Sequence, residues 1–189
     1  MEFQRKLKSD ELTRLALRMQ KGDRKAAAAL YDELAPKLYG FLFARTNERE
    51  VAEDLSQEIF IKLLEKIESF DASRGVFTVW FWQIARNALI DHYREKKPLP
   101  FSSFEEEAVP LLAVAGAPNL DHQLGAQQVR QWIETLDADE QELFQYRFVA
   151  ELSYREMASL CGKSEGALRV AASRLKARIK KEFGNSLFS

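Results

Sequence analysis

The prolines of this chain gather in one short stretch, and that distribution constrains the fold more than any other feature. Four of the five prolines lie there: Pro98, Pro100, Pro110 and Pro118. Proline lacks a backbone N–H and restrains the residue before it, so continuous helix is not expected in this stretch. It also carries four acidic residues and no lysine or arginine. We interpret residues 98–122 as a flexible acidic linker between two domains, residues 1–97 and 123–189.

The segments on both sides of this linker have helical periodicity. In residues 51–68, apolar side chains recur every four positions, as on one face of a helix: Leu55, Ile59, Leu63 and Ile67. No segment shows the alternation that is typical of strands. The sequence therefore predicts an all-α fold of two small helical domains. The expected helices span residues 10–20, 25–46, 51–68, 80–95, 123–135, 138–149, 153–160 and 164–182.

Composition favours a soluble globular protein of the cytoplasm. The chain is 46% hydrophobic and 30% charged, with a net charge of −1. No apolar run approaches the roughly 20 residues of a membrane helix, so membrane insertion is not expected. The N-terminus lacks the apolar core of a signal peptide. The single cysteine, Cys161, cannot form an internal disulfide and is expected to pack as a small apolar side chain.

Residues 152–181 are typical of a helix-turn-helix. Ser153 and Glu156 have the spacing of a capping box, Gly162 can take the positive φ of a turn, and Ser164 can cap the next helix. From Lys163 to Lys181 there are seven basic residues and one acidic residue. A local basic stripe on the second helix favours DNA binding, whereas the alternative is a solvated basic helix without a partner.

Aromatic and basic side chains alternate in residues 70–97. Aromatic rings can stack on unpaired bases while cations hold the phosphate backbone, so this segment is suited to single-stranded DNA. The alternative is an aromatic core, and we expect Phe81 and one of Trp80 and Trp82 to be packed inside it.

Two motifs in these segments resemble a known family. The pattern D-x-x-Q-E-x-F begins at Asp54 and precedes W-x-x-x-I-A-R-N, which begins at Trp80. This run is similar to region two of extracytoplasmic-function (ECF) sigma factors of bacterial RNA polymerase, and residues 136–178 are similar to region four. Together the two regions cover nearly the whole chain. The resemblance implies a sigma factor that binds core polymerase and directs promoter-specific initiation.

The resemblance also implies roles for individual residues. The β′ clamp helices of the polymerase would contact Asp54, Gln57, Glu58 and Phe60. The −10 promoter element would be bound by Phe70, Asp71, Arg74, Phe77, Trp80, Asn87 and Arg94, on a loop over residues 70–78 turned by Gly75 and on the following helix. The −35 element would be read by Ser164, Arg169, Val170, Ser173, Arg174, Lys176 and Arg178. Further implied partners are the β flap and, in part of the family, an anti-sigma factor.

The second helix departs from many relatives, which carry a polar residue at the position of Val170 and a basic one at Ala171. Promoter contacts at this point are therefore expected to be unusual. Two other functions stay open: a stand-alone helix-turn-helix regulator that binds duplex DNA, and an adaptor that binds only protein. The chain has two histidines and no nucleophile motif, phosphate loop or metal-ligand spacing, so we expect neither enzyme activity nor a cofactor.

Overall fold

The computed structural model describes residues 2–96, 129, 131–133 and 135–184, and this part of the chain contains helices and no strand. The prediction of an all-α fold is therefore confirmed. The first half consists of α1 (Glu2–Gln20), α2 (Arg24–Thr46), α3 (Arg49–Lys66), the 3₁₀ turn η1 (Ile67–Ser69) and α4 (Phe77–Lys96). The second half contains α6 (Ala138–Phe144), η3 (Gln145–Val149), α7 (Tyr154–Cys161) and α8 (Glu165–Phe183). The predicted linker lies outside the described residues.

Local sequence signals set most of the helix ends. Gly22 has φ +82° after α1, and the Asp23 carboxylate accepts hydrogen bonds from the first backbone N–H groups of α2. At the other end of α2, Asn47 takes the left-handed conformation of a C-terminal cap. Pro36 lies within α2 and does not end it.

Two helices begin earlier than the periodicity predicted. α1 begins at Glu2 rather than near residue 10, and α4 begins at Phe77 rather than Trp80. The predicted loop over residues 70–78 is therefore too long. A hydrogen bond from the Phe77 N–H to the Thr13 hydroxyl fixes the start of α4 against α1. The two residues are 64 positions apart in the sequence.

The helix-turn-helix forms as expected. Ser153 and Glu156 make both hydrogen bonds of a capping box at the start of α7. Gly162 has φ +68° at the end of α7, and the Ser164 hydroxyl accepts from the Ala167 N–H at the start of α8. The residues of η3, predicted as part of one long helix, instead form a π-helix.

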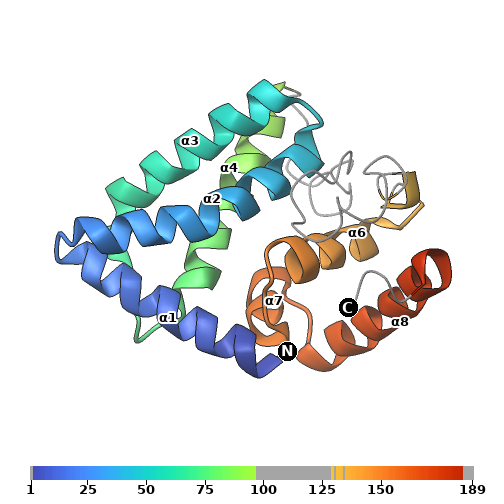
Figure 1. Ribbon diagram of the computed structural model, residues 1–189. Coiled ribbons are helices and arrows are strands. Elements are labelled where there is room, and N and C mark those ends of the chain that lie inside the picture. Colours follow the sequence, from blue (N-terminus) through green and yellow to red (C-terminus); the bar gives the residue numbers. More distant parts are fainter. Residues whose placement is uncertain (1, 97–128, 130, 134, 185–189) are drawn as a thin grey trace.

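The two halves pack against each other. α7 lies beside α1 and the beginning of α4, and η3 contacts α2 (Figure 1). Between α2 and η3, the rings of Phe41 and Tyr146 stack with centroids 5.7 Å apart. Buried apolar residues of both halves form one continuous cluster, so the described chain has a shared core.

Candidate nucleic-acid and protein interfaces

α8 has an apolar face and a basic face. Its inward stripe is fully buried, as predicted: Leu168, Ala172, Leu175 and Ile179. The predicted DNA-reading residues are arranged on the other side, where Arg169, Val170, Ser173, Arg174 and Arg178 are exposed and Lys176 is half-buried. Val170 is 53% exposed, so this row of polar and basic side chains includes one apolar position. An exposed row of this composition can contact base edges and phosphates.

Several cations of this surface are held by neighbours in the chain. The Arg169 guanidinium lies 3.4 Å from the Glu165 carboxylate and 4.8 Å from the centre of the Tyr154 ring. Arg178 forms an ion pair with Glu140. These contacts orient the guanidinium groups, and their exposed position keeps them within reach of phosphate.

Asp71 holds the loop before α4 in a turn through hydrogen bonds. The Asp71 carboxylate accepts from the backbone N–H and the hydroxyl of Ser73, at 2.9 and 2.7 Å, and these bonds lower its pKa. The Arg74 N–H donates to the Asp71 carbonyl, which completes a turn. Gly75 does not have a positive φ, so the expected glycine-dependent turn is wrong. Asp71 and Arg74 are exposed.

Two aromatic residues that we expected in this DNA-binding loop are core residues. Phe70 is 5% exposed and Phe77 is fully buried, and their rings meet edge to face at 5.5 Å. Trp80 is half-buried and packs on both. Phe81 and Trp82 are buried, as the packing alternative predicted. Only Trp80 of this group offers part of its ring to a ligand.

Three predicted −10 residues share one face of α4. Trp80, Asn87 and Arg94 are spaced by seven residues, which is close to two helical turns. Asn87 is exposed and accepts a hydrogen bond from the Gln83 amide, and Arg94 lies 3.6 Å from Asp91. The helix thus presents a partly apolar ring, an amide and a cation in one line.

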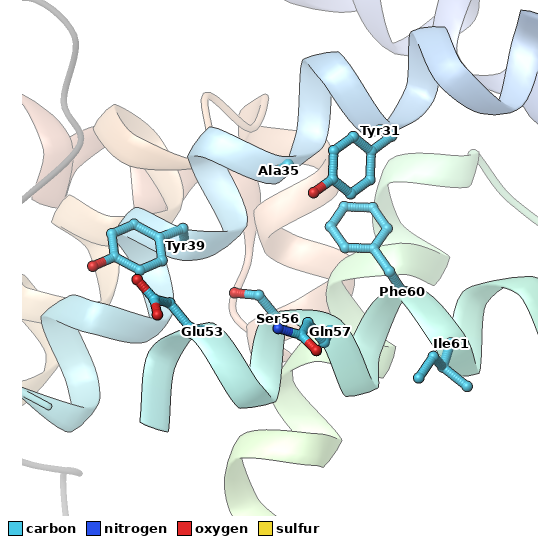
Figure 2. A pocket seen from close by; sticks show the side chains of 8 residues that line it. All are labelled: Tyr31, Ala35, Tyr39, Glu53, Ser56, Gln57, Phe60 and Ile61. Carbon is cyan, nitrogen blue, oxygen red and sulfur yellow. The ribbon is translucent and has the colours of Figure 1, made fainter. Parts of the chain in front are cut away.

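A groove between α2 and α3 contains part of the predicted protein interface. Figure 2 shows its lining: Tyr31, Ala35, Tyr39, Glu53, Ser56, Gln57, Phe60 and Ile61. Its volume is about 440 Å³. The Phe60 ring contacts Tyr31 at 4.7 Å and the buried Phe81 at 6.0 Å, so it is anchored at the floor of the groove.

Charge borders this groove. Asp54 and Glu58 are exposed on the outer side of α3, and Glu58 pairs with Lys62 at 2.5 Å. Ile61 and Leu64 are 55% and 61% exposed. The sequence did not reveal the contribution of Tyr31, because only the packing of α2 on α3 places it beside Phe60. An exposed apolar strip with acidic neighbours is typical of a protein-binding surface.

The structure brings one predicted −10 residue and one predicted −35 residue to the same place. Arg74 and Arg169 line a single cleft of about 630 Å³ between the two halves, together with Lys6, Arg155 and Glu165. The sequence offered no signal for this juxtaposition, because it depends on how the halves pack.

The described residues offer few reactive or metal-binding groups. Burial raises the pKa of the Cys161 thiol to about 12, so the reactive thiolate is rare at neutral pH. In the described part of the chain, no group of three or more histidine, cysteine, aspartate or glutamate side chains could hold a metal ion. No described helix has the length and apolarity needed to cross a membrane.

Both halves match models of one protein family. Residues 30–98 match sigma-70 region 2, and residues 126–179 match sigma-70 region 4. The two matches occur in the order expected from the sequence motifs and leave residues 99–125 between them, which include nearly all of the predicted linker.

Individual relatives agree with these matches. The ECF RNA polymerase sigma factor BldN of Streptomyces coelicolor is 28% identical over 163 residues, which cover 85% of this chain and 61% of the relative. The RNA polymerase sigma factor YlaC of Bacillus subtilis is 27% identical over 159 residues, covering 83% and 91%. The fold is similar to that of CnrH, solved in complex with the cytosolic domain of CnrY, with a TM-score of 0.61 at 19% identity, covering 92% of this chain and 96% of CnrH.

Proposed function

This chain belongs to the ECF group of the sigma-70 family, and we propose that it binds core RNA polymerase and directs promoter-specific transcription initiation through the surfaces described above. The observation that carries the proposal is the presence of both sigma regions in one chain, each with an exposed surface of suitable chemistry. As a member of a family of initiation factors, the chain needs no catalytic group or cofactor of its own. We place its action in the cytoplasm, where polymerase transcribes.

Region four, which we assign to residues 123–189, reads the −35 element as duplex DNA. The N-terminal half of α8 enters the major groove, and Arg169, Ser173 and Arg174 supply groups for base edges and phosphates. Ser164, Lys176 and Arg178 contact the backbone. Val170 offers only an apolar contact, such as to a thymine methyl group, so it favours thymine at one position.

Region two, which we assign to residues 1–97, binds the −10 element after melting. Asp71 and Arg74 on the loop, with Trp80, Asn87 and Arg94 on α4, form the binding surface. Stacking of an unpaired base on an aromatic ring contributes about 1–3 kcal/mol. Because Phe70 and Phe77 are buried, we assign them the support of Trp80 rather than direct contact with DNA.

Residues 98–122 connect the two regions. The polymerase docks on α3, where Gln57 and Phe60 lie in the groove and Asp54 and Glu58 lie beside it. The clamp helices of β′ would occupy this surface, and the β flap would contact region four. An anti-sigma factor is a further proposed partner, which the complex of CnrH with the cytosolic domain of CnrY supports.

The first test is run-off transcription with purified core polymerase on a pool of promoter fragments. We expect transcripts that depend on this protein and share two spaced upstream elements. Arg174→Ala should reduce these transcripts about tenfold through the lost −35 contact. Arg24→Ala removes the same charge from an exposed site on α2 and should leave them unchanged.

Two outcomes would overturn the proposal. If the protein neither binds core polymerase nor supports transcripts, yet retards duplex DNA by itself, the stand-alone regulator becomes the better assignment. Absence of any salt-dependent DNA binding would instead favour the protein-binding adaptor.

A second test separates DNA contact from core packing in region two. Trp80→Ala should lower open-complex formation while the free energy of unfolding falls only moderately, because the ring is half-buried. Phe77→Ala should cost about 3–5 kcal/mol of stability by leaving a cavity in the core. Chemical denaturation and permanganate footprinting of the melted strand measure the two effects. Equal losses in both measurements for both variants would contradict the assignment.

A further inference from the structure

A buried carboxylate joins the two halves of the chain. Glu156, on α7, is 5% exposed and accepts a hydrogen bond from the Ser9 hydroxyl at 2.7 Å and another from the Thr78 hydroxyl. Ser9 lies on α1 and Thr78 on the first turn of α4, so both donors belong to the other half. A buried carboxylate is stable only when donors surround it, and these two are lost when the halves separate.

Four charges close the rim of the same interface. Glu151, in the connection before α7, lies 2.6 Å from the Lys37 ammonium and 3.5 Å from that of Lys8. Glu33 pairs with the same two lysines at 2.5 and 2.6 Å. The cluster therefore ties α1 and α2 to the second half with alternating charge. We call Glu156, Ser9, Thr78 and this four-charge cluster the latch.

The latched arrangement cannot span a promoter. Arg74 and Arg169 line one cleft in this structure. The DNA elements assigned to them are about 25 base pairs apart, which is about 85 Å of duplex at roughly 3.4 Å per base pair. Latch closure and simultaneous binding of both elements therefore exclude each other.

The protein-binding face of α3 stays open while the latch is closed. In the first half, the residues that make the polar contacts of the latch lie on α1, α2 and the first turn of α4. Asp54, Gln57 and Glu58 are exposed in the same structure, and Gln57 lines the groove beside Phe60. A partner can thus reach α3 without separating the halves.

Some polar atoms near the interface are buried without hydrogen bonds, and their burial opposes the closed state. Gln145 lies on η3, the element that contacts α2, and it is fully buried. Neither polar atom of its side chain has a hydrogen-bond partner among the described residues. The Nε atom of Arg45 on α2 is also buried without a partner. Because unpaired buried polar groups oppose burial, the closed state is only moderately favoured and can be released.

We propose that the chain docks on core polymerase through α3 in the closed state, and that release of Glu156 from Ser9 and Thr78 is a later step that frees α8 to reach the −35 element. The proposal rests on the proposed sigma-factor function. It assigns to the latch control over promoter engagement rather than over polymerase docking.

The test uses the full chain with the double substitution Ser9→Ala and Thr78→Val, which removes both donors and leaves the capping bonds of Glu156 in place. Small-angle X-ray scattering reports closure: a compact chain of this length has a radius of gyration of about 16 Å, and we expect the variant to exceed about 20 Å. The control Thr46→Val removes a hydroxyl that bonds only within the first half, and it should stay compact. Glu151→Lys opens the rim by repulsion from Lys8 and Lys37 and serves as an independent variant.

Two binding measurements complete the test. The affinity of each variant for core polymerase should stay within about twofold of the unaltered chain, whereas the rate of open-complex formation by the holoenzyme should rise several-fold. Two results would overturn the proposal: no expansion in either opening variant, or an expansion accompanied by a tenfold or greater gain in polymerase affinity. If the unaltered chain does not bind core polymerase at all, the proposed function fails, while the scattering result still decides whether a latch exists.

Discussion

Glu151 has a strained backbone conformation, and two lysines hold its side chain by ion pairs. Its φ of 58° lies in the left-handed region, which costs an L-residue other than glycine roughly 1 kcal/mol. Burial would raise its pKa, but the hydrogen bond from Lys37 and the charges of Lys37 and Lys8 prevail and hold the pKa below its ordinary value. The lysines thus keep Glu151 charged at a position where the backbone alone favours glycine.

This combination predicts an order of stability for two substitutions. Glu151→Ala loses the ion pairs and keeps the strain, whereas Glu151→Gly loses the same pairs and removes the strain. We expect the glycine variant to be more stable than the alanine variant by about 1 kcal/mol, as measured by urea denaturation. The opposite order would mean that the bend before α7 relaxes freely.

Local roles of residues were predictable, and distant ones were not. Ser153 and Ser164 cap their helices as the spacing predicted, because capping needs only a side chain three residues away. The same logic placed Glu156 in the capping box. Its contact with Ser9 spans 147 residues, and no local pattern encodes such a partner.

At the scale of elements, periodicity located the helices but not all of their ends. The apolar repeat of α3 and the stripe of α8 fall on buried positions as predicted. The beginning of α4 was placed too late because Phe77 owes its position to packing and to the Thr13 hydroxyl. The π-helix of η3 has no signature in the sequence, and this unexpected element lies against α2.

The two glycines around the turn of the helix-turn-helix give a matched prediction. Gly162 has φ +68°, so Gly162→Ala should destabilise the chain by about 1 kcal/mol. Gly166, in the first turn of α8, does not have a positive φ, and an added Cβ would meet no atom within 4 Å. Gly166→Ala should therefore be neutral or stabilise by up to about 1 kcal/mol. Thermal denaturation of both variants tests this, and similar shifts of the same sign would contradict it.

At the scale of the whole molecule, the packing of the halves is the feature that the sequence could not predict. The candidate surfaces on α3 and α8 could be found because motif and charge are local. The cleft that joins Arg74 to Arg169 depends on contacts between residues far apart in the chain. The charge cluster at the interface between the halves looks like ordinary surface charge when Lys8, Glu33 and Lys37 are considered one at a time.

The same cluster predicts an effect of pH on closure. Lys37 and Lys8 lower the pKa of Glu33 and Glu151 below their ordinary value of 4.5, although burial acts in the other direction. Glu33 and its two lysines all belong to the first half, so only the ion pairs of Glu151 are lost on opening. The lowered pKa of Glu151 means that it stabilises the closed state fully above about pH 4.5, and this contribution is lost as the pH falls through the lowered pKa. We expect the radius of gyration to rise on acidification below about pH 4.5 while helical circular dichroism is retained.

Glu151→Gln provides the comparison for this pH effect. It removes the titrating group that pairs across the interface, so its expansion on acidification should be smaller than that of the unaltered chain. An unaltered chain that stays compact until its helices melt would show that the cluster does not control closure.

The residues of the latch are synthesised at different times, because they lie far apart in the chain. Thr78 and Glu156 are separated by 78 residues, so at roughly 5–20 residues per second the hydroxyl is synthesised about 4–16 s before its acceptor. Throughout that interval the nascent first half cannot be held by α7, because α7 does not yet exist. Every new chain therefore passes through an unlatched state, in which α3 is complete while α7 has not yet been synthesised.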